Sequence, residues 1–344
     1  MTDLAARLVR WQRSHGRSAL PWQNTCDPYR VWLSEVMLQQ TQVSTVLGYF
    51  SRFLDRFPTV ADLAAAHEDE VMGLWSGLGY YSRARNMHRC AGEVVARFGG
   101  EFPRTAAQLE TLPGIGRSTA AAIAAFCFGE RVAILDGNVK RVLTRVLGFE
   151  GDLASAANER MLWDLATRML PPEGREEDMP AYTQGLMDLG ATVCTPRKPA
   201  CLLCPVASGC RAQALGEQER FPIKTRKLRR SSQSIWMLVA RDAQGRVWLE
   251  KRPASGIWAG LYCLPCFDDR AELAALVPID RDEELSDAPA FMHVLTHKDL
   301  HLHPVNWEAH KAIELSPKGA WFARDAWPGL GLPAPVRKLL LETA

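Results

Sequence analysis

Several features are missing from this sequence of 344 residues, and each absence excludes a class of protein. No uncharged apolar run reaches the ~18–20 residues that a membrane-spanning helix needs, so we expect no membrane segment. The first 17 residues mix acidic and basic side chains among the apolar ones, which is not the pattern of a secretory signal. There is no internal repeat or low-complexity tract, and a hydrophobic share of 47% is enough to bury a core, which excludes a disordered chain.

A strong net charge is also missing, since 41 basic and 39 acidic residues give only +2 at pH 7. Residues 1–223 are neutral overall, and residues 231–344 hold 12 basic against 15 acidic side chains, or −3. Between them, five of the seven residues from Lys224 to Arg230 are cationic. This run is either a solvated basic linker or a segment that contacts the phosphates of a polyanion.

The nine cysteines are an odd number, and no export signal accompanies them. We therefore expect a reducing environment rather than a disulfide framework. Four of the nine lie within 17 residues, with three prolines among them: Cys194, Cys201, Cys204 and Cys210. This spacing has one close pair where a zinc site usually has two, so it favours an iron–sulfur cluster, with zinc and purely structural cysteines as alternatives.

The pattern of the sequence changes near residues 225–234. Up to residue 210, apolar residues recur at helical spacing between proline and glycine breaks, which predicts a bundle of short helices. After the basic run, the segments 234–240, 247–249, 291–296 and 300–304 predict strands. We therefore predict an all-α domain over residues 1–224, a basic linker over 225–234 and an α+β domain over 235–344.

Residues 112–119, Leu-Pro-Gly-Ile-Gly-Arg-Ser-Thr, lie between two predicted helices. Gly114 and Gly116 would let backbone N–H groups point outward beside the positive end of the second helix, which creates an anion site. An ordinary turn between helices is the alternative.

Two carboxylates are candidates for chemistry. Glu35 lies on a largely apolar predicted helix with no cation close in sequence, so burial should raise its pKa and suit it to general-acid catalysis. A partly exposed helix glutamate is the alternative. Asp136 follows an apolar run at the start of a predicted helix, where it could simply be an N-cap.

Together, the hairpin, the carboxylates and the cysteine loop resemble the endonuclease III superfamily of DNA glycosylases. The strings at 34–41, 77–85 and 133–141 and the C-terminal domain are further similar to the adenine DNA glycosylase (MutY) family, over residues 1–344. The resemblance implies a multidomain protein with an all-α helix–hairpin–helix glycosylase domain and an α+β Nudix-like C-terminal domain. It also implies a 4Fe–4S cluster on the four cysteines and double-stranded DNA as the partner.

The resemblance assigns roles to single residues. Glu35 would protonate adenine N7, and Asp136, assisted by Asn138, would stabilise the positive charge that develops on the sugar. Ser118 stands where bifunctional relatives carry the lysine that forms a Schiff base, so hydrolysis without strand cleavage is expected. The residues expected to bind DNA or the base are Trp22, Gln39, Gln40, Tyr80, Gly114, Gly116, Gln184, Thr296 and His297.

The C-terminal domain lacks the acidic helix pattern that a working Nudix hydrolase needs, so we expect it to recognise 8-oxoguanine. Thr296 and His297 would contribute, although leucine replaces the phenylalanine of the family loop. Cys263 and Cys266 are more typical of a packed pair than of a metal site. The resemblance thus implies an enzyme that removes adenine paired with 8-oxoguanine or guanine. We expect a monomer, because one active site and one lesion reader lie on one chain, and the unpaired cysteines predict the cytoplasm, with the nucleoid as its place if the source is bacterial. The sequence leaves three rival functions open: a glycosylase for another base such as thymine, a non-catalytic iron–sulfur DNA-binding protein, and a nucleotide pyrophosphohydrolase.

Overall fold

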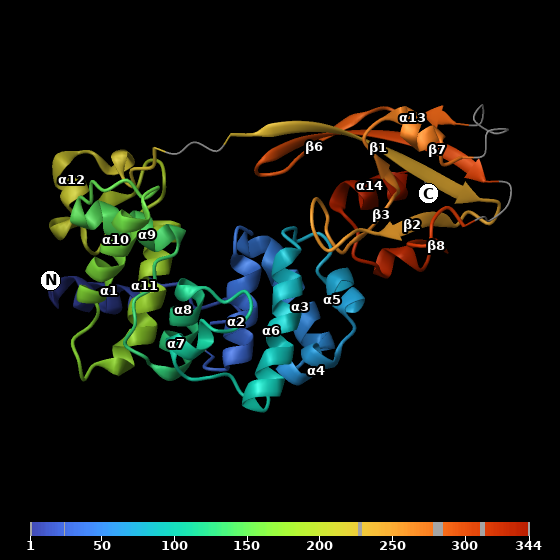
Figure 1. The fold of residues 1–344 in the computed structure, drawn as a ribbon. Helices are drawn as coiled ribbons and strands as arrows, with labels where there is room; N and C mark the ends of the chain where they lie inside the picture. Colours follow the sequence, from blue (N-terminus) through green and yellow to red (C-terminus); the bar gives the residue numbers. More distant parts are fainter. Residues whose placement is uncertain (1, 24, 226–228, 278–284, 310–313, 343–344) are drawn as a thin grey trace. The chain divides into compact units, whose positions relative to one another are not determined.

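The computed structural model of the protein describes residues 2–23, 25–225, 229–277, 285–309 and 314–342 (Figure 1). The chain forms two compact units. The first contains Met1–Ala64 and Arg89–Lys227, and the second contains Ala65–His88 and Leu228–Ala344. The second unit is therefore assembled from two separate stretches of sequence. Residues 226–228 of the expected basic linker lie outside the described residues.

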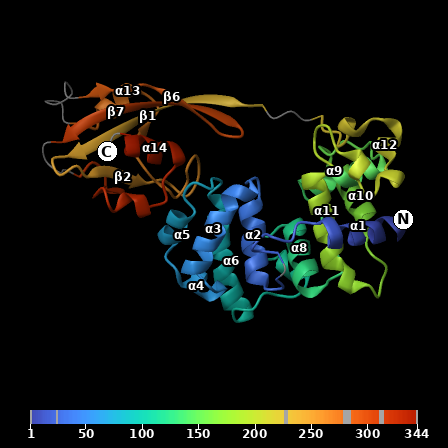
Figure 2. The ribbon, with the colours of Figure 1, turned by 180° about the vertical axis from the view of Figure 1, so that it is seen from behind.

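The first unit is helical, as the spacing of apolar residues predicts. Figure 2 shows α1, α9, α10, α11 and α12 at one end of this unit and α2, α3 and α6 at the other, with α8 between them. Its helices are α1 (Thr2–His15), α2 (Pro28–Leu38), α3 (Val43–Arg56), α4 (Val60–Ala65), the greater part of α6 (Ser82–Phe98), α7 (Ala106–Leu109), α8 (Arg117–Phe128), α9 (Gly137–Leu147), α10 (Ala156–Arg168), α11 (Met179–Thr192) and α12 (Arg211–Leu215).

Local sequence fixes where the two helices at the site begin. Asp27 caps α2 by accepting a hydrogen bond from the Tyr29 backbone N–H at 2.9 Å, and a proline follows at the first helical position. Asp136 caps α9 in the same way, with its Oδ1 2.7 Å from the Val139 nitrogen. Gly148 then ends α9 in the left-handed conformation, with φ 59°, which glycine adopts without strain.

The core of the first unit lies around α11, which packs on α1, α8 and α9. Leu8, Val139 and Leu186 are buried there. Ala121, Ala122 and Ala125 of α8 are buried in the same core, because small side chains let neighbouring helices approach closely.

The second unit is a mixed sheet with helices on both faces (Figure 1). Its strands are β1 (Ser231–Asp242), β2 (Val247–Lys251), β3 (Tyr262–Cys263), β4 (Cys266–Phe267), β5 (Ser286–Asp287), β6 (Phe291–Val294), β7 (Lys298–Ala309) and β8 (Gly319–Phe322). The order is β3-β2-β1-β7-β5, with β4 beside β1, β6 beside β7 and β8 beside β2. The central pair, β1 and β7, is parallel from Ser231↔Lys298 to Asp242↔Ala309. Helix α14 (Ala334–Glu342) packs on one face, and α13 (Arg270–Ala274) packs on the other.

The stretch Ala65–His88 is an integral part of the second unit. It contains α5 (Glu68–Leu74) and the first turns of α6. Asp69 binds Lys251 and accepts a hydrogen bond from the Tyr262 hydroxyl at 3.3 Å. Tyr81 donates to the Leu332 carbonyl at 2.8 Å. Gly73 lies so close to the 3-10 turn Trp327–Gly329 that an added Cβ would clash with a backbone oxygen of that turn.

Across the described residues, no helix is long and apolar enough to cross a membrane.

Candidate active site

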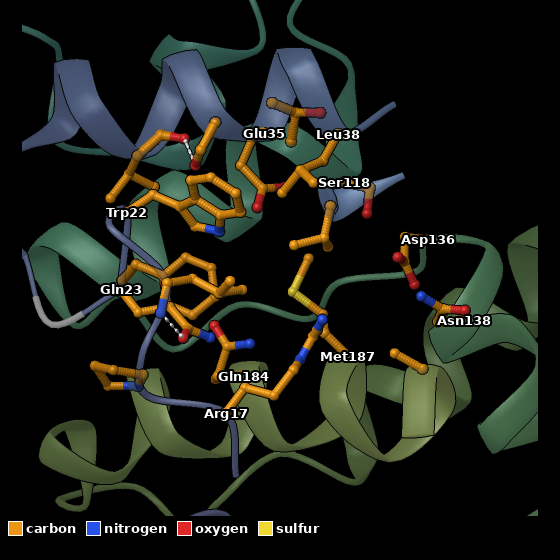
Figure 3. A pocket seen from close by; sticks show the side chains of 18 of the residues that line it. Arg17, Trp22, Gln23, Glu35, Leu38, Ser118, Asp136, Asn138, Gln184 and Met187 are labelled. Atoms are coloured by element: carbon orange, nitrogen blue, oxygen red, sulfur yellow. Dashed lines mark hydrogen bonds between the residues drawn. The ribbon is translucent and has the colours of Figure 1, made fainter. Parts of the chain in front are cut away.

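A cavity of about 1010 Å³ opens in the first unit between residues of α2, α9 and α11 (Figure 3). Its lining brings together residues that are far apart in the sequence. Eight of the site residues predicted from the sequence contribute to this lining: Trp22, Glu35, Gln39, Gln40, Ser118, Asp136, Asn138 and Gln184.

The Glu35 carboxyl group points into this cavity from α2 (Figure 3). Its helix neighbours Trp32, Leu33 and Val36 are buried in the protein, so little water reaches the carboxyl group from behind. Burial first, and the negative charge of Asp136 second, raise the pKa of Glu35 from 4.5 to about 8. The side chain therefore holds its proton at neutral pH, as a general acid must.

Asp136 enters the same cavity from the start of α9 (Figure 3). Burial raises its pKa, while hydrogen bonds from the backbone of Val139 and Asn138 and the charges of Arg141 and Lys140 lower it. The N-cap role and a role in the cavity are compatible, because Asp136 lines the cavity while its Oδ1 binds the first turn of the helix.

Two neighbours fix the segment around Asp136. The Ser118 hydroxyl accepts a hydrogen bond from the Leu135 backbone at 3.2 Å, which ties α8 to the residue before Asp136. The Asn138 side-chain oxygen accepts one from Arg141 at 2.8 Å, and the same guanidinium also binds the Gly190 carbonyl at 2.7 Å.

A buried ion pair that the sequence prediction missed lies beside Gln184. Asp188 is 0% exposed, and its Oδ1 accepts from Arg17 Nε at 2.7 Å and from Gln184 Nε2 at 2.9 Å. The spacing of four residues between Gln184 and Asp188 on one helix could have indicated the pair. Arg17 could not have been found, because it comes from a distant loop.

Trp22 completes the apolar part of the lining, with Leu38, Phe126 and Met187. Its ring is 8% exposed and packs edge-on against Phe50, with the ring centroids 5.3 Å apart. Gln39 and Gln40 follow α2 at the edge of the cavity, and Gln40 has a φ of 56°, unusual for a residue with a side chain.

The two glycines of the hairpin lie outside the cavity lining. Gly114 has a φ of 76°, where glycine is favoured. Gly116 has ordinary extended backbone and is the N-cap of α8. An added Cβ at Gly116 would meet nothing within 4 Å, so its small size leaves an open approach to the backbone at this helix end.

The four clustered cysteines line a separate small cavity of the first unit, with Val142, Leu189 and Val193 around them. Burial raises the pKa of the Cys204 thiol to about 11. Arg145 donates hydrogen bonds to the Thr195 and Pro196 carbonyls, which holds this loop on α9. Among the described residues, no three candidate ligands converge on one ion position. Four thiols around one shared cavity are the donor set of a 4Fe–4S cluster, which the spacing of the cysteines favours.

The remaining predicted residues lie in the second unit. Thr296 and His297 form the turn between β6 and β7. The Tyr80 hydroxyl is 2.5 Å from the Thr296 hydroxyl, and the Tyr80 side chain is 45% exposed. Tyr80 also has a positive φ of 48°.

Comparisons with known proteins decide the family. An adenine DNA glycosylase from Buchnera aphidicola subsp. Schizaphis graminum is 36% identical over 339 residues, covering 97% of this chain and 96% of the relative. The chain belongs to the adenine DNA glycosylase family. The human adenine DNA glycosylase is 45% identical over 230 residues, covering 64% of this chain and 41% of the human one. This family membership makes the chain a base-excision repair hydrolase for the N-glycosyl bond of adenine, rather than a thymine glycosylase or a non-catalytic DNA-binding protein.

The domain models agree with the fold predicted from the sequence. Residues 33–167 match the HhH-GPD superfamily of base excision DNA repair proteins, residues 194–210 match the iron–sulfur binding domain of endonuclease III, and residues 236–342 match the NUDIX domain. These matches confirm the fold class and the 4Fe–4S cofactor that we predicted from the sequence. A thermostable thymine-DNA glycosylase has a TM-score of 0.54 and 27% identity, over 62% of this chain and 95% of that one.

Proposed function

We propose that this enzyme is a monofunctional adenine glycosylase for A:8-oxoguanine and A:G mispairs, with Glu35 as the acid and Asp136 as the stabilising carboxylate. The observation that carries the proposal is that both carboxyl groups enter one cavity, with the pKa of each raised by burial. Paired carboxyl groups in such a site suit acid-assisted cleavage of a glycosyl bond.

The base must leave the duplex, because its glycosyl bond is out of reach within the stack. Gln184 is the residue we assign to adenine recognition. The Asp188 carboxylate can only accept hydrogen bonds when ionised, so it selects the orientation in which the Gln184 amide nitrogen faces it. The amide oxygen is then available to accept a hydrogen bond from the exocyclic amino group of adenine. Trp22 supplies a flat apolar wall for the base.

The proposed reaction begins with proton transfer from Glu35 to adenine N7, which makes the base a better leaving group. The glycosyl bond breaks, and its electron pair leaves with the adenine. Asp136 stabilises the positive charge on the sugar, and Asn138 and Ser118 hold its segment in place. Water then adds to the sugar C1′ and releases a proton.

We expect hydrolysis without strand cleavage, because the described lining of the cavity contains no lysine amine that could attack the sugar. Among the described residues that line it, none is a lysine, and position 118 offers a hydroxyl already bound to the backbone of Leu135. A Schiff base with the sugar needs a primary amine, and the described lining of the cavity supplies no such amine.

Recognition of the base opposite adenine is assigned to the second unit. Tyr80 offers an exposed aromatic face, and Thr296, bonded to it, offers a hydroxyl beside His297. We propose that these three side chains contact 8-oxoguanine. Gln39 and Gln40 are proposed to contact DNA at the mouth of the cavity, and Gly114 and Gly116 to bind a phosphate through backbone N–H groups.

We further propose that Cys194, Cys201, Cys204 and Cys210 are the four ligands of the 4Fe–4S cluster. When bound, the cluster would crosslink the loop that Arg145 holds on α9. A monomer acting on DNA in the cytoplasm is the proposed working form, which sedimentation of the enzyme alone and with duplex DNA would test.

The decisive experiment is single-turnover base release from duplexes that carry A:8-oxoguanine, A:G, A:T or T:G, with Glu35→Gln as the matched variant. We expect fast adenine release from the first two duplexes, no strand break before alkali, and no release by the variant despite normal binding. Equal rates on A:T would contradict the proposed mispair preference. Full activity of the variant would contradict the role of Glu35.

A further inference from the structure

The second unit holds a pair of cysteines that adenine hydrolysis does not use. Cys263 on β3 and Cys266 on β4 have their sulfur atoms 3.7 Å apart, within the distance of a thiol–thiol hydrogen bond. The two strands pair with different neighbours, Cys263 opposite Glu250 of β2 and Cys266 opposite Met237 of β1. The contact therefore joins two parts of the sheet across a two-residue connection.

This pair is not a metal site in the described part of the chain, because no third cysteine, histidine or carboxylate converges on it. Its surroundings also differ from those of a thiol that only fills space. Cys263 is fully buried, while Cys266 keeps part of its surface exposed. Cys266 is therefore the residue of the pair that lies nearer the solvent, and the Cys263 sulfur lies within hydrogen-bond distance of its sulfur.

A positive charge faces the pair. The Arg252 guanidinium acts on both sulfurs, and its Nε has no hydrogen-bond partner in the described residues. The pKa of Cys266 is lowered, first by its hydrogen bond with Cys263 and further by the charge of Arg252. Burial and the charge of Glu250 act in the opposite direction. Cys90 shows the contrast: it is buried, and burial raises its pKa to about 12.

We propose that Cys263 and Cys266 are a redox-active dithiol that hydrogen peroxide converts into an intramolecular disulfide. The Cys266 thiolate attacks one oxygen of the peroxide, the O–O bond breaks, and hydroxide leaves to become water, so that Cys266 becomes a sulfenic acid. The Cys263 sulfur then attacks the Cys266 sulfur and releases its own proton. The S–O bond breaks, and hydroxide leaves with that proton as a second water. Two thiols are oxidised by two electrons, and one peroxide is reduced to two waters.

The geometry leaves little movement to make. The sulfur atoms must approach from 3.7 Å to a covalent bond of about 2.05 Å, which side-chain rotation can provide. Cys26, exposed and in the first unit, serves as an internal reference for an accessible thiol.

The test uses the full chain with its cluster. The protein is treated with graded hydrogen peroxide, the peroxide is removed with catalase, free thiols are blocked with N-ethylmaleimide, and tryptic peptides are weighed. Residues 252–270 hold both cysteines on one peptide, since trypsin does not cut before Pro253. At peroxide doses that leave Cys26 reactive toward N-ethylmaleimide, we expect this peptide to carry no N-ethylmaleimide and to be two hydrogens lighter than the dithiol form. Reduction with dithiothreitol before the blocking step should restore both N-ethylmaleimide adducts.

Retention of both adducts until Cys26 is oxidised, or until the visible absorbance of the cluster is lost, would overturn the proposal. So would conversion of Cys266 to sulfinic acid without a crosslink. Cys263→Ala should leave a Cys266 sulfenic acid that dimedone traps, and Cys90→Ala should behave as the wild type. If Cys263→Ala does not fold, the peptide masses of the wild-type protein still decide between the two outcomes.

Discussion

Adenine release should fall as pH rises through about 8, because the reaction needs the protonated form of Glu35. The structure raises the pKa of this side chain from 4.5 to about 8. At pH 7 roughly nine-tenths of the molecules then hold the proton, against roughly 0.3% for a carboxyl group with the ordinary pKa. The raised pKa of Glu35 is thus expected to supply a rate advantage of roughly 300-fold at neutral pH.

The shape of the pH profile follows from the sign of both shifts. Glu35 acts as an acid, so activity is present below its folded-state pKa and falls about tenfold per pH unit above it. Asp136 acts as an anion, and its pKa is also raised, so activity falls again on the acid side as Asp136 takes up a proton. We therefore expect a bell-shaped profile with its alkaline limb near pH 8.

The assay is single-turnover adenine release from an A:8-oxoguanine duplex between pH 5 and 9.5, at saturating enzyme. Binding of the Glu35→Gln variant across the same range separates loss of chemistry from loss of DNA affinity. A rate that stays constant from pH 7 to pH 9.5, or that rises as pH increases through 8, would refute the reasoning. The second outcome would mean that Glu35 acts as a base.

Three further predictions test the surroundings of the site. Glu35→Gln should raise the melting temperature at pH 8 more than at pH 5, because a carboxyl group with a raised folded-state pKa loses stability as pH rises from 4.5 to about 8; equal shifts at both pH values would contradict this. Asp188→Asn should slow adenine release roughly tenfold to a hundredfold, by freeing the Gln184 amide and leaving Arg17 unpaired, and an unchanged single-turnover rate would show that the ion pair is not needed. Thr296→Val should lower release from A:8-oxoguanine about tenfold and spare A:G, with Thr296→Ser as the control; equal losses on both duplexes would argue against lesion contact.

Local sequence predicted the parts of the site that local physics determines. The run of apolar residues around Glu35 predicts burial, and burial is the largest cause of its raised pKa. The second cause, the charge of Asp136, arises from a residue about a hundred positions away and requires the folded chain. Likewise, the sequence shows that Asp136 starts a helix, but not that α2 and α9 contribute to one cavity.

Four strands of the C-terminal unit, β1, β2, β6 and β7, were predictable because apolar runs are separated by turn signals such as Gly245, which has a φ of 71°, whereas the shorter β3, β4, β5 and β8 were not predicted. The place of residues 65–88 was not. Nothing in that stretch indicates that Asp69 pairs with Lys251, about 180 residues later, or that Tyr80 meets Thr296. Such pairs depend on the sheet being assembled first.

A unit built from two distant stretches affects how the chain folds during synthesis. His88, the last residue of the first stretch, leaves the ribosome 140 residues before Leu228, the first residue of the second stretch. At about 5–20 residues per second, this stretch waits roughly 7–28 s before its partners emerge. In that interval Asp69 lacks Lys251, and Tyr81 lacks the Leu332 carbonyl, which are their partners in the folded protein. A chain shortened to residues 1–227 would lack these partners permanently, so we expect this stretch to be less stable there than in the full chain.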